Sequence, residues 1–155
     1  MGTDNWMDGS ANWDTEAAVP TSTSKVDVAE GDPKITRKMS IASLVDSATI
    51  TFADPDNGVI ASAISGGVDV SGQLLFDAGI CQGGSSLKTG GPLTNSGTID
   101  LGNRDLAATD TVQAAALDNT GTLDLVGGVT ADREMQLDIT GAAGVRARGR
   151  AVRRR

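Results

Sequence analysis

A nine-residue pattern recurs along the chain at nearly constant spacing, and no other feature restricts the fold as strongly. Two copies, residues 93–101 (LTNSGTIDL) and 117–125 (LDNTGTLDL), share six of nine residues at an offset of 24. The other copies begin at Val68, Leu44, Pro20 and Leu137, so that successive offsets along the chain are 24, 24, 25, 24 and 20. Six copies at such regular spacing predict a repeat protein in which each unit packs on its neighbours.

The pattern itself predicts a turn followed by a strand. It reads apolar, x, x, Ser or Thr, small, x, apolar, x, apolar. The seventh and ninth positions are two apart, which places both side chains on one face of a strand, while the mostly polar eighth position faces solvent. At the fifth position stand Gly72, Gly97, Gly121 and Gly141. We expect these glycines to provide a positive φ in a turn, with Asn95 and Asn119 adding Asx-type bonds.

A unit of about 24 residues leaves room for two more short strands, such as residues 60–64 and 112–117. None of these intervals shows a sustained 3.6-residue period. Stacking such units about 4.8 Å apart pairs every strand in parallel and aligns like residues into internal ladders. A leucine-rich repeat has a similar period but needs Leu at several fixed spacings before a helical half. The sequence therefore predicts an all-β fold, a right-handed parallel β-helix of about five to six coils.

The residue composition suits thin repeated layers better than one thick core. Among 155 residues there are 20 Gly, two Phe and two Trp, but no Tyr and no His. A compact globule of this length usually buries several aromatic side chains, whereas the apolar residues here are mainly Val, Ile, Leu and Ala. Because His is absent, triads that pair a Ser or Cys nucleophile with a His base are excluded.

Charge is divided unevenly along the chain. Residues 1–145 carry 20 acidic and seven basic side chains, a net charge of −13, while residues 146–155 carry six Arg. An acidic body repels nucleic acid and anionic lipid, so we expect neither as a partner. The apolar runs are too short to cross a membrane. Cys81 is the only cysteine, which excludes an internal disulfide, and we expect it to be a small buried or turn residue.

These residues resemble a known family. The copies at 93–101 and 117–125 are similar to the coils of bacterial autotransporter passenger domains and related β-strand-repeat surface proteins. The opening, with Trp6, Trp13, Val19-Pro20 and KVDV at residues 25–28, is similar to the segment that precedes the first coils in those proteins. The resemblance covers roughly residues 4–141. It implies a parallel β-helix exported from a Gram-negative bacterium to the cell surface, in a native polypeptide with a C-terminal β-barrel.

The chain departs from that family at both ends. Residues 1–6 have neither the basic start nor the apolar stretch of a signal peptide, and the family's membrane β-barrel is missing. After Gly141 the pattern gives way to the Arg-rich end, which we interpret as a misread or truncated end rather than a further coil. We therefore expect a fragment of a longer exported polypeptide, unable by itself to insert into a membrane.

The sequence divides into three expected segments: an N-terminal cap at residues 1–19, β-helix repeats at 20–145 and an Arg-rich disordered tail at 146–155. The predicted function is a non-catalytic structural or adhesive segment of an exported cell-surface protein, with a host or neighbouring cell surface or a glycan as partner. Two alternatives stay open. A β-helix polysaccharide-degrading enzyme would show a groove with several carboxylates and a basic residue, and a carbohydrate-binding module would show two exposed coplanar Trp rings.

We expect no catalytic, cofactor-binding or metal-binding residue. Asp100 and Asp124 take equivalent positions on successive coils and would lie about 5 Å apart, within reach of acid/base chemistry or a shared cation. No Arg, Lys or His recurs beside them, which favours two solvated carboxylates. Residues 54–58 (DPDNG) hint at a calcium loop, but the further acidic ligands of an EF-hand are lacking and turn chemistry explains the motif.

The tryptophans and the Arg-rich end have simpler explanations than ligand binding. Trp6 and Trp13 are seven residues apart and could stack on sugar rings. A solenoid's first coil leaves strand edges and an apolar end that bulky side chains must cover, so we expect them to form a cap. The Arg-rich end could bind phosphate, but we expect a disordered or non-native tail.

Overall fold

The strands are short and form three parallel sheets. The computed structural model describes residues 20–53, 59–79, 83–130, 132–141 and 143–144, which contain 16 strands and no helix. Sheet A consists of β1 (Lys25–Val28), β4 (Ser43–Asp46), β7 (Val68–Val70), β10 (Pro92–Asn95), β13 (Ala116–Asn119) and β16 (Ala143–Gly144). Sheet B consists of β2 (Lys34–Ile35), β5 (Thr49–Phe52), β8 (Gln73–Phe76), β11 (Thr98–Leu101) and β14 (Thr122–Leu125). Sheet C consists of β3 (Ser40–Ile41), β6 (Ala61–Ile64), β9 (Ser86–Thr89), β12 (Asp110–Ala114) and β15 (Met135–Ile139).

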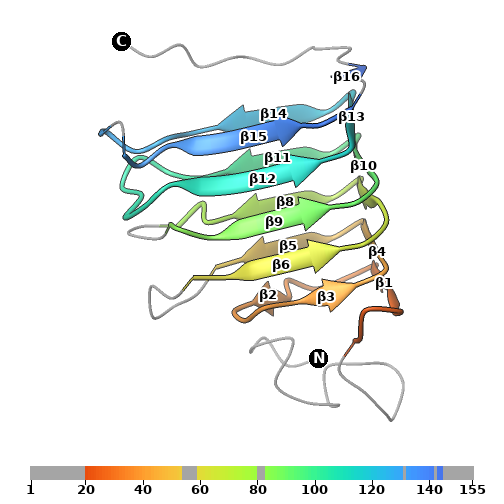
Figure 1. The fold of residues 1–155 in the computed structure, drawn as a ribbon. Helices are drawn as coiled ribbons and strands as arrows, with labels where there is room; N and C mark the ends of the chain where they lie inside the picture. The colour runs from red at the N-terminus through yellow and green to blue at the C-terminus, as the bar shows by residue number, and fades with distance from the viewer. Residues whose placement is uncertain (1–19, 54–58, 80–82, 131, 142, 145–155) are drawn as a thin grey trace.

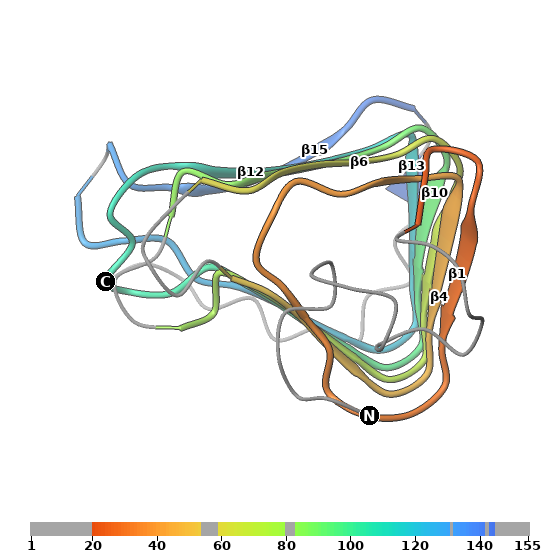
Figure 2. The ribbon, with the colours of Figure 1, turned by 90° about the horizontal axis from the view of Figure 1, so that it is seen from below.

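The chain visits the three sheets in the fixed order A, B, C, and each circuit is one turn of a parallel β-solenoid (Figure 1). Seen from below, the sheets form the three sides of a roughly triangular cross-section (Figure 2). The corners between sheets A and B and between sheets C and A are tight. The corner between sheets B and C carries longer loops, which extend to the left in Figure 2.

The full-length turns follow the predicted spacing. Strands of sheet A pair at Leu44 with Val68, Val68 with Leu93, Leu93 with Leu117 and Leu117 with Ala143, which are offsets of 24, 25, 24 and 26 residues. The prediction of stacked, in-register copies from residue 44 to residue 125 is confirmed. The fold has about four turns, fewer than the five to six coils that the sequence predicts.

The outermost copies of the pattern do not occupy the predicted register. Val26 pairs with Leu44 in sheet A and does not lie below Ile50, because the first turn takes only 18 residues. Leu137 pairs with Val112 in sheet C and not with a strand of sheet A. Each strand of the solenoid has the same two-residue alternation, so a strand of the wrong sheet can mimic the apolar positions.

The nine-residue pattern covers two strands and the turn between them, and not a turn and one strand. Its first positions form sheet A, its last four form sheet B, and the Ser/Thr and Gly residues make the corner. The predicted strand at residues 60–64 corresponds to β6. Residues 112–117 contain the end of β12, a corner at Ala115 and the start of β13.

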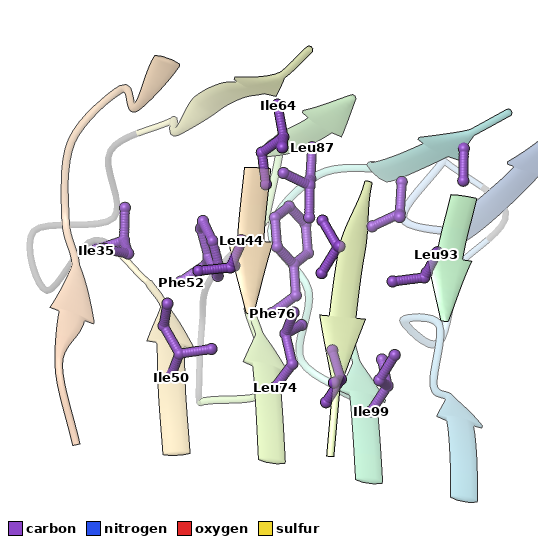
Figure 3. Close-up of a cluster of buried hydrophobic side chains, with 14 of the residues drawn as sticks. Ile35, Leu44, Ile50, Phe52, Ile64, Leu74, Phe76, Leu87, Leu93 and Ile99 are labelled. Atoms are coloured by element: carbon purple, nitrogen blue, oxygen red, sulfur yellow. The ribbon is translucent and has the colours of Figure 1, made fainter. Parts of the chain in front are cut away.

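Ladders of like side chains fill the core, as predicted for the seventh and ninth positions. Sheet B provides Ile50, Leu74, Ile99 and Leu123 in one ladder and Ile35, Phe52, Phe76, Leu101 and Leu125 in the next. The rings of Phe52 and Phe76 are 5.9 Å apart between centroids, at 43° to each other. Figure 3 shows six of these side chains in the space that the sheets enclose: Ile35, Ile50, Phe52, Leu74, Phe76 and Ile99. Their burial supplies the main favourable free energy of such a fold.

Glycines at the corner between sheets A and B are required by close packing and not by backbone conformation. The described glycines with positive φ are Gly31, Gly83, Gly84 and Gly102, none of which belongs to the repeat pattern. The prediction of a positive φ at Gly72, Gly97, Gly121 and Gly141 is therefore wrong. A Cβ atom on Gly97 would lie 2.1 Å from the backbone oxygen of Gly72 in the turn below, and one on Gly121 would lie 2.1 Å from that of Gly97. Side chains at this corner would separate the turns.

The two ends of the solenoid differ in how well they bury their ladders. At the N-terminal end, Val26 and Ile35 are 5% and 0% exposed. At the other end, Leu123, Leu137 and Ile139 are half-buried and Leu125 is 38% exposed. β14 and β15 are the last strands of their sheets in the described part of the chain, so their apolar side chains have a neighbouring turn on one side only.

Candidate functional site

The outward face of sheet B contains two of the residues that the sequence singled out. Asp100 and Asp124 are register partners on β11 and β14, as predicted, and both are half-buried on the outer face. The amide Nε2 of Gln73 donates a hydrogen bond to Asp100 Oδ2 at 3.2 Å. Across the described ranges, no group of three or more His, Cys, Asp or Glu residues comes together to hold a metal ion. The two aspartates therefore form a half-buried pair of like charges on successive turns.

Two asparagines that the sequence assigned to turns point into the core instead. Asn95 and Asn119 are 1% and 3% exposed and stack in sheet A. Asn95 Nδ2 donates to Asn119 Oδ1 and to the backbone oxygen of Thr122, both at 2.7 Å. Asn119 Nδ2 donates to the backbone oxygen of Gly121 at 3.4 Å. This short ladder connects successive turns at the A–B corner, and buried amides that are hydrogen-bonded in this way favour one register over others.

Asp46 occupies the same inward column as the asparagines, between Val28 and Val70. Its side chain is fully buried, and Oδ1 accepts a hydrogen bond from the backbone N–H of Ala48 at 3.2 Å. Oδ2 has no partner among the described residues. Burial therefore raises the pKa of Asp46 from 3.8 to about 6, although the hydrogen bond from Ala48 lowers it in part.

The corner between sheets B and C has the longest connections of the full-length turns. These connections lie within residues 53–60, 77–85, 102–109 and 126–134, and we call their described residues the B–C loops. Asp77 begins one of them with a φ of 46°, and Gly102 follows with a φ of 72° in the loop above. Asn103 Nδ2 donates to the backbone oxygen of Asp77 at 2.7 Å, and Leu106 is completely buried. Loops held on a rigid scaffold are common positions for binding residues.

Two carboxyl groups are buried where the B–C loops adjoin their sheets. Asp77 and Asp110 are 1% and 0% exposed. Asp110 Oδ1 accepts a hydrogen bond from the backbone N–H of Ser85 at 3.0 Å. Burial raises the pKa of Asp110 from 3.8 to about 7, with the negative charge of Asp77 as the second cause. Hydrogen bonds from the backbone of Ser85 and Gly84 lower that pKa in part.

The sequence gives only a weak signal for these two buried aspartates. Asp110 is the first residue of a strand and Asp77 follows one, positions at which aspartate is ordinarily a turn or capping residue. The hydrogen bond of Asp110 depends on the 25-residue stacking that places it above Ser85. Both side chains have almost no exposed surface among the described residues.

Several residues discussed from the sequence lie outside the described ranges: the loop at 54–58, Cys81, Trp6, Trp13 and the segment 146–155. In the part of the chain that the structure describes, no helix has the length and apolar character to cross a bilayer. The chain matches no protein-family model, no curated protein and no solved structure. Its function is therefore argued from the solenoid and its surfaces.

Proposed function

We propose that this chain is a non-catalytic structural or adhesive segment of an exported bacterial cell-surface protein. In this proposal the solenoid is right-handed and residues 1–19 cap its first turn. The partner is a glycan or the surface of a host or neighbouring cell. The observation that carries the proposal is the regular stacking of the repeat from residue 44 to residue 125, with polar side chains on its outer faces.

The outer face of sheet B shows how polar side chains repeat from turn to turn. Its outward positions are Lys34, Thr49, Thr51, Gln73, Leu75, Thr98, Asp100, Thr122 and Asp124. Short hydroxyl and carboxylate side chains dominate this face and repeat from turn to turn. Such a surface suits a rigid spacer, or a flat surface for weak contacts repeated along its length, because each turn adds the same geometry. The resemblance of residues 93–101 and 117–125 to passenger coils points in the same direction.

The first experiment tests location. Antibodies raised against the purified chain should label intact cells of the bacterium that produces it, and trypsin added to those cells should remove the label. A cytoplasmic protein of the same cells serves as the control and should stay unlabelled and undigested. Labelling that appears only after the cells are broken would contradict the proposal that the chain is exposed at the surface.

A second experiment tests adhesion against catalysis. Beads coated with the chain should bind to a panel of immobilised glycans or cultured cells, and beads coated with an Ile99→Asp variant should not. The variant places a charge at a side chain that is 0% exposed, so it tests whether binding needs the folded solenoid. The release of new reducing or unsaturated sugar ends from an acidic or neutral polysaccharide would contradict the non-catalytic function and favour the enzyme.

A further inference from the structure

One inward column of side chains runs along the A–B corner, where the strands of sheet A end. From turn to turn it contains Val28, Asp46, Val70, Asn95 and Asn119, which pair in register. All five side chains are buried. We call this set the corner column. Its polar members have to find hydrogen-bond partners within the corner itself, because water does not reach them.

The two asparagines show which partners the corner offers. The amide nitrogen of Asn119 donates to the backbone oxygen of Gly121, two residues further along the chain. The amide nitrogen of Asn95 donates to the backbone oxygen of Thr122, which begins the sheet B strand of the next turn. Backbone oxygens at this corner therefore accept from side-chain donors, in addition to their place in the ladder, since each has two lone pairs.

Asp46 meets the same corner with a carboxyl group in place of an amide. At its level of the stack, the backbone oxygens equivalent to those two acceptors belong to Ala48 and Gln73. Asp46 Oδ1 accepts the backbone N–H of Ala48 at 3.2 Å, while Oδ2 has no hydrogen-bond partner among the described residues. An ionised carboxylate has no hydrogen to donate to a carbonyl oxygen, whereas a protonated carboxyl has one O–H. The corner therefore fits the protonated form of Asp46.

The charged side chains around Asp46 do not neutralise it. Strands β3, β5, β6 and β8 contain none. Those on β1, β2, β7 and the connections of the first turn are all exposed, while Asp46 is 0% exposed: Lys25, Asp27, Glu30, Asp32, Lys34, Arg37, Lys38 and Asp69. An ionised Asp46 would hold its charge away from water, with Val28 and Val70 as its neighbours in the corner column.

We propose that Asp46 is protonated in the folded chain at mildly acidic pH and donates a hydrogen bond to a backbone oxygen of the A–B corner, as the asparagine amides do in the turns above. Loss of this proton as the pH rises removes the donor and leaves a buried charge between Val28 and Val70. The stacking of the first turns on one another is then weaker. The contacts of Asn95 and Asn119 higher in the column do not depend on pH.

The sign of the pH dependence follows from burial. Burial raises the pKa of Asp46 from 3.8 to about 6, and the hydrogen bond from Ala48 lowers it in part. Between these two values the folded chain holds a proton that the unfolded chain has lost. The stabilising effect of this proton is complete below pH 3.8 and disappears as the pH rises through about 6.

Asp46→Asn provides the test, because an amide has both groups that the corner requires at every pH. Its oxygen can accept from Ala48 and its nitrogen can donate to a backbone oxygen, as in Asn95 and Asn119. The matched control is Asp69→Asn, the same change on the exposed outer face of the neighbouring strand β7. Asp110, whose pKa is also raised, to about 7, is present in all three proteins, so its contribution cancels in the comparison.

Urea denaturation of the full chain, followed by circular dichroism between about pH 4.5 and pH 7.5, measures the proton linkage. Over this range the unfolding constant of wild type should rise on the order of 20-fold more than that of Asp46→Asn. The two proteins should be similar in stability at the acidic end and differ at the other. Asp69→Asn should behave as wild type. Equal pH dependence in wild type and Asp46→Asn, or the same loss of slope in Asp69→Asn, would overturn the proposal.

Carbon-13 NMR of wild type gives a second measurement that does not depend on unfolding or on the variant's ability to fold. The side-chain carboxyl resonance of Asp46, assigned through its own backbone signals, should titrate well above pH 3.8. A midpoint at or below that ordinary value would show that Asp46 is ionised in the corner, and would refute the proposed donor.

Discussion

Truncating the internal ladder of sheet B should reveal where the folded solenoid ends. Ile99 and Leu123 occupy adjacent positions in this ladder, and the pattern alone predicts that both are internal. The structure distinguishes them: Ile99 is 0% exposed between Leu74 and Leu123, while Leu123 is half-buried on the last strand of the sheet. Ile99→Ala should therefore be much more destabilising than Leu123→Ala.

The magnitudes follow from burial. Ile99→Ala removes three buried carbon atoms, which at roughly 0.8 kcal/mol each gives about 2.4 kcal/mol of lost transfer free energy. The cavity between the turns above and below adds to this loss, for a total of about 3–4 kcal/mol. Leu123→Ala removes three partly exposed carbon atoms and leaves no closed cavity, so we expect a loss of about 1 kcal/mol.

Guanidinium denaturation monitored by circular dichroism measures both variants, with the slope m compared to confirm that the same amount of structure unfolds. Asp124→Ala is the control on the same strand. It should be nearly neutral or mildly stabilising, because it removes like-charge stacking on Asp100 at the outer face. If Leu123→Ala proves as costly as Ile99→Ala, further chain covers β14 in solution, and the assignment of β14 as an edge is wrong.

Three further predictions test the connections between turns and the end of the chain. Asn95→Ala should lower the free energy of unfolding by about 1–3 kcal/mol, because Asn119 Oδ1 and the backbone oxygen of Thr122 lose their hydrogen-bond donor. An unchanged denaturation midpoint would show that water replaces the Asn95 amide. Gly97→Ala should lower the melting temperature, since the new methyl group meets backbone in the turn below, and a neutral result would mean that the corner can widen. Brief trypsin digestion should remove residues 146–155 and leave a stable core. Deleting these residues should leave the circular dichroism spectrum unchanged, and the shortened chain should still self-associate at high concentration through its open end. A protease-resistant tail would contradict both expectations.

The repeat made the middle of the fold predictable. From residue 44 to residue 125, pairing follows the nine-residue pattern because Leu93 and Leu117, or Ile99 and Leu123, can stack in only one register that buries both strands. The ends were less predictable. The first turn shortens to 18 residues and β15 lies in sheet C, and alternation of apolar residues does not identify the sheet to which a strand belongs.

The candidate sites show a similar division. The outward pairing of Asp100 with Asp124 follows directly from the repeat, since side chains two apart share a face and the residue between them does not. The inward direction of Asn95 and the burial of Asp46 did not follow from it. Both residue types are ordinarily turn or surface residues, and only the position of the corner shows that they belong to an inward column.

The sequence by itself determined a parallel all-β repeat fold, its period and the internal ladders of its middle turns. These depend on alternation and spacing, which are properties of a single strand and its copies. The tertiary structure decided the number of turns, the steric reason for the corner glycines and the burial of Asp77 and Asp110. Each of these depends on how far apart successive turns lie and on which loops close the third corner. Such distances arise only when all the turns pack together, so no local pattern of residues encodes them.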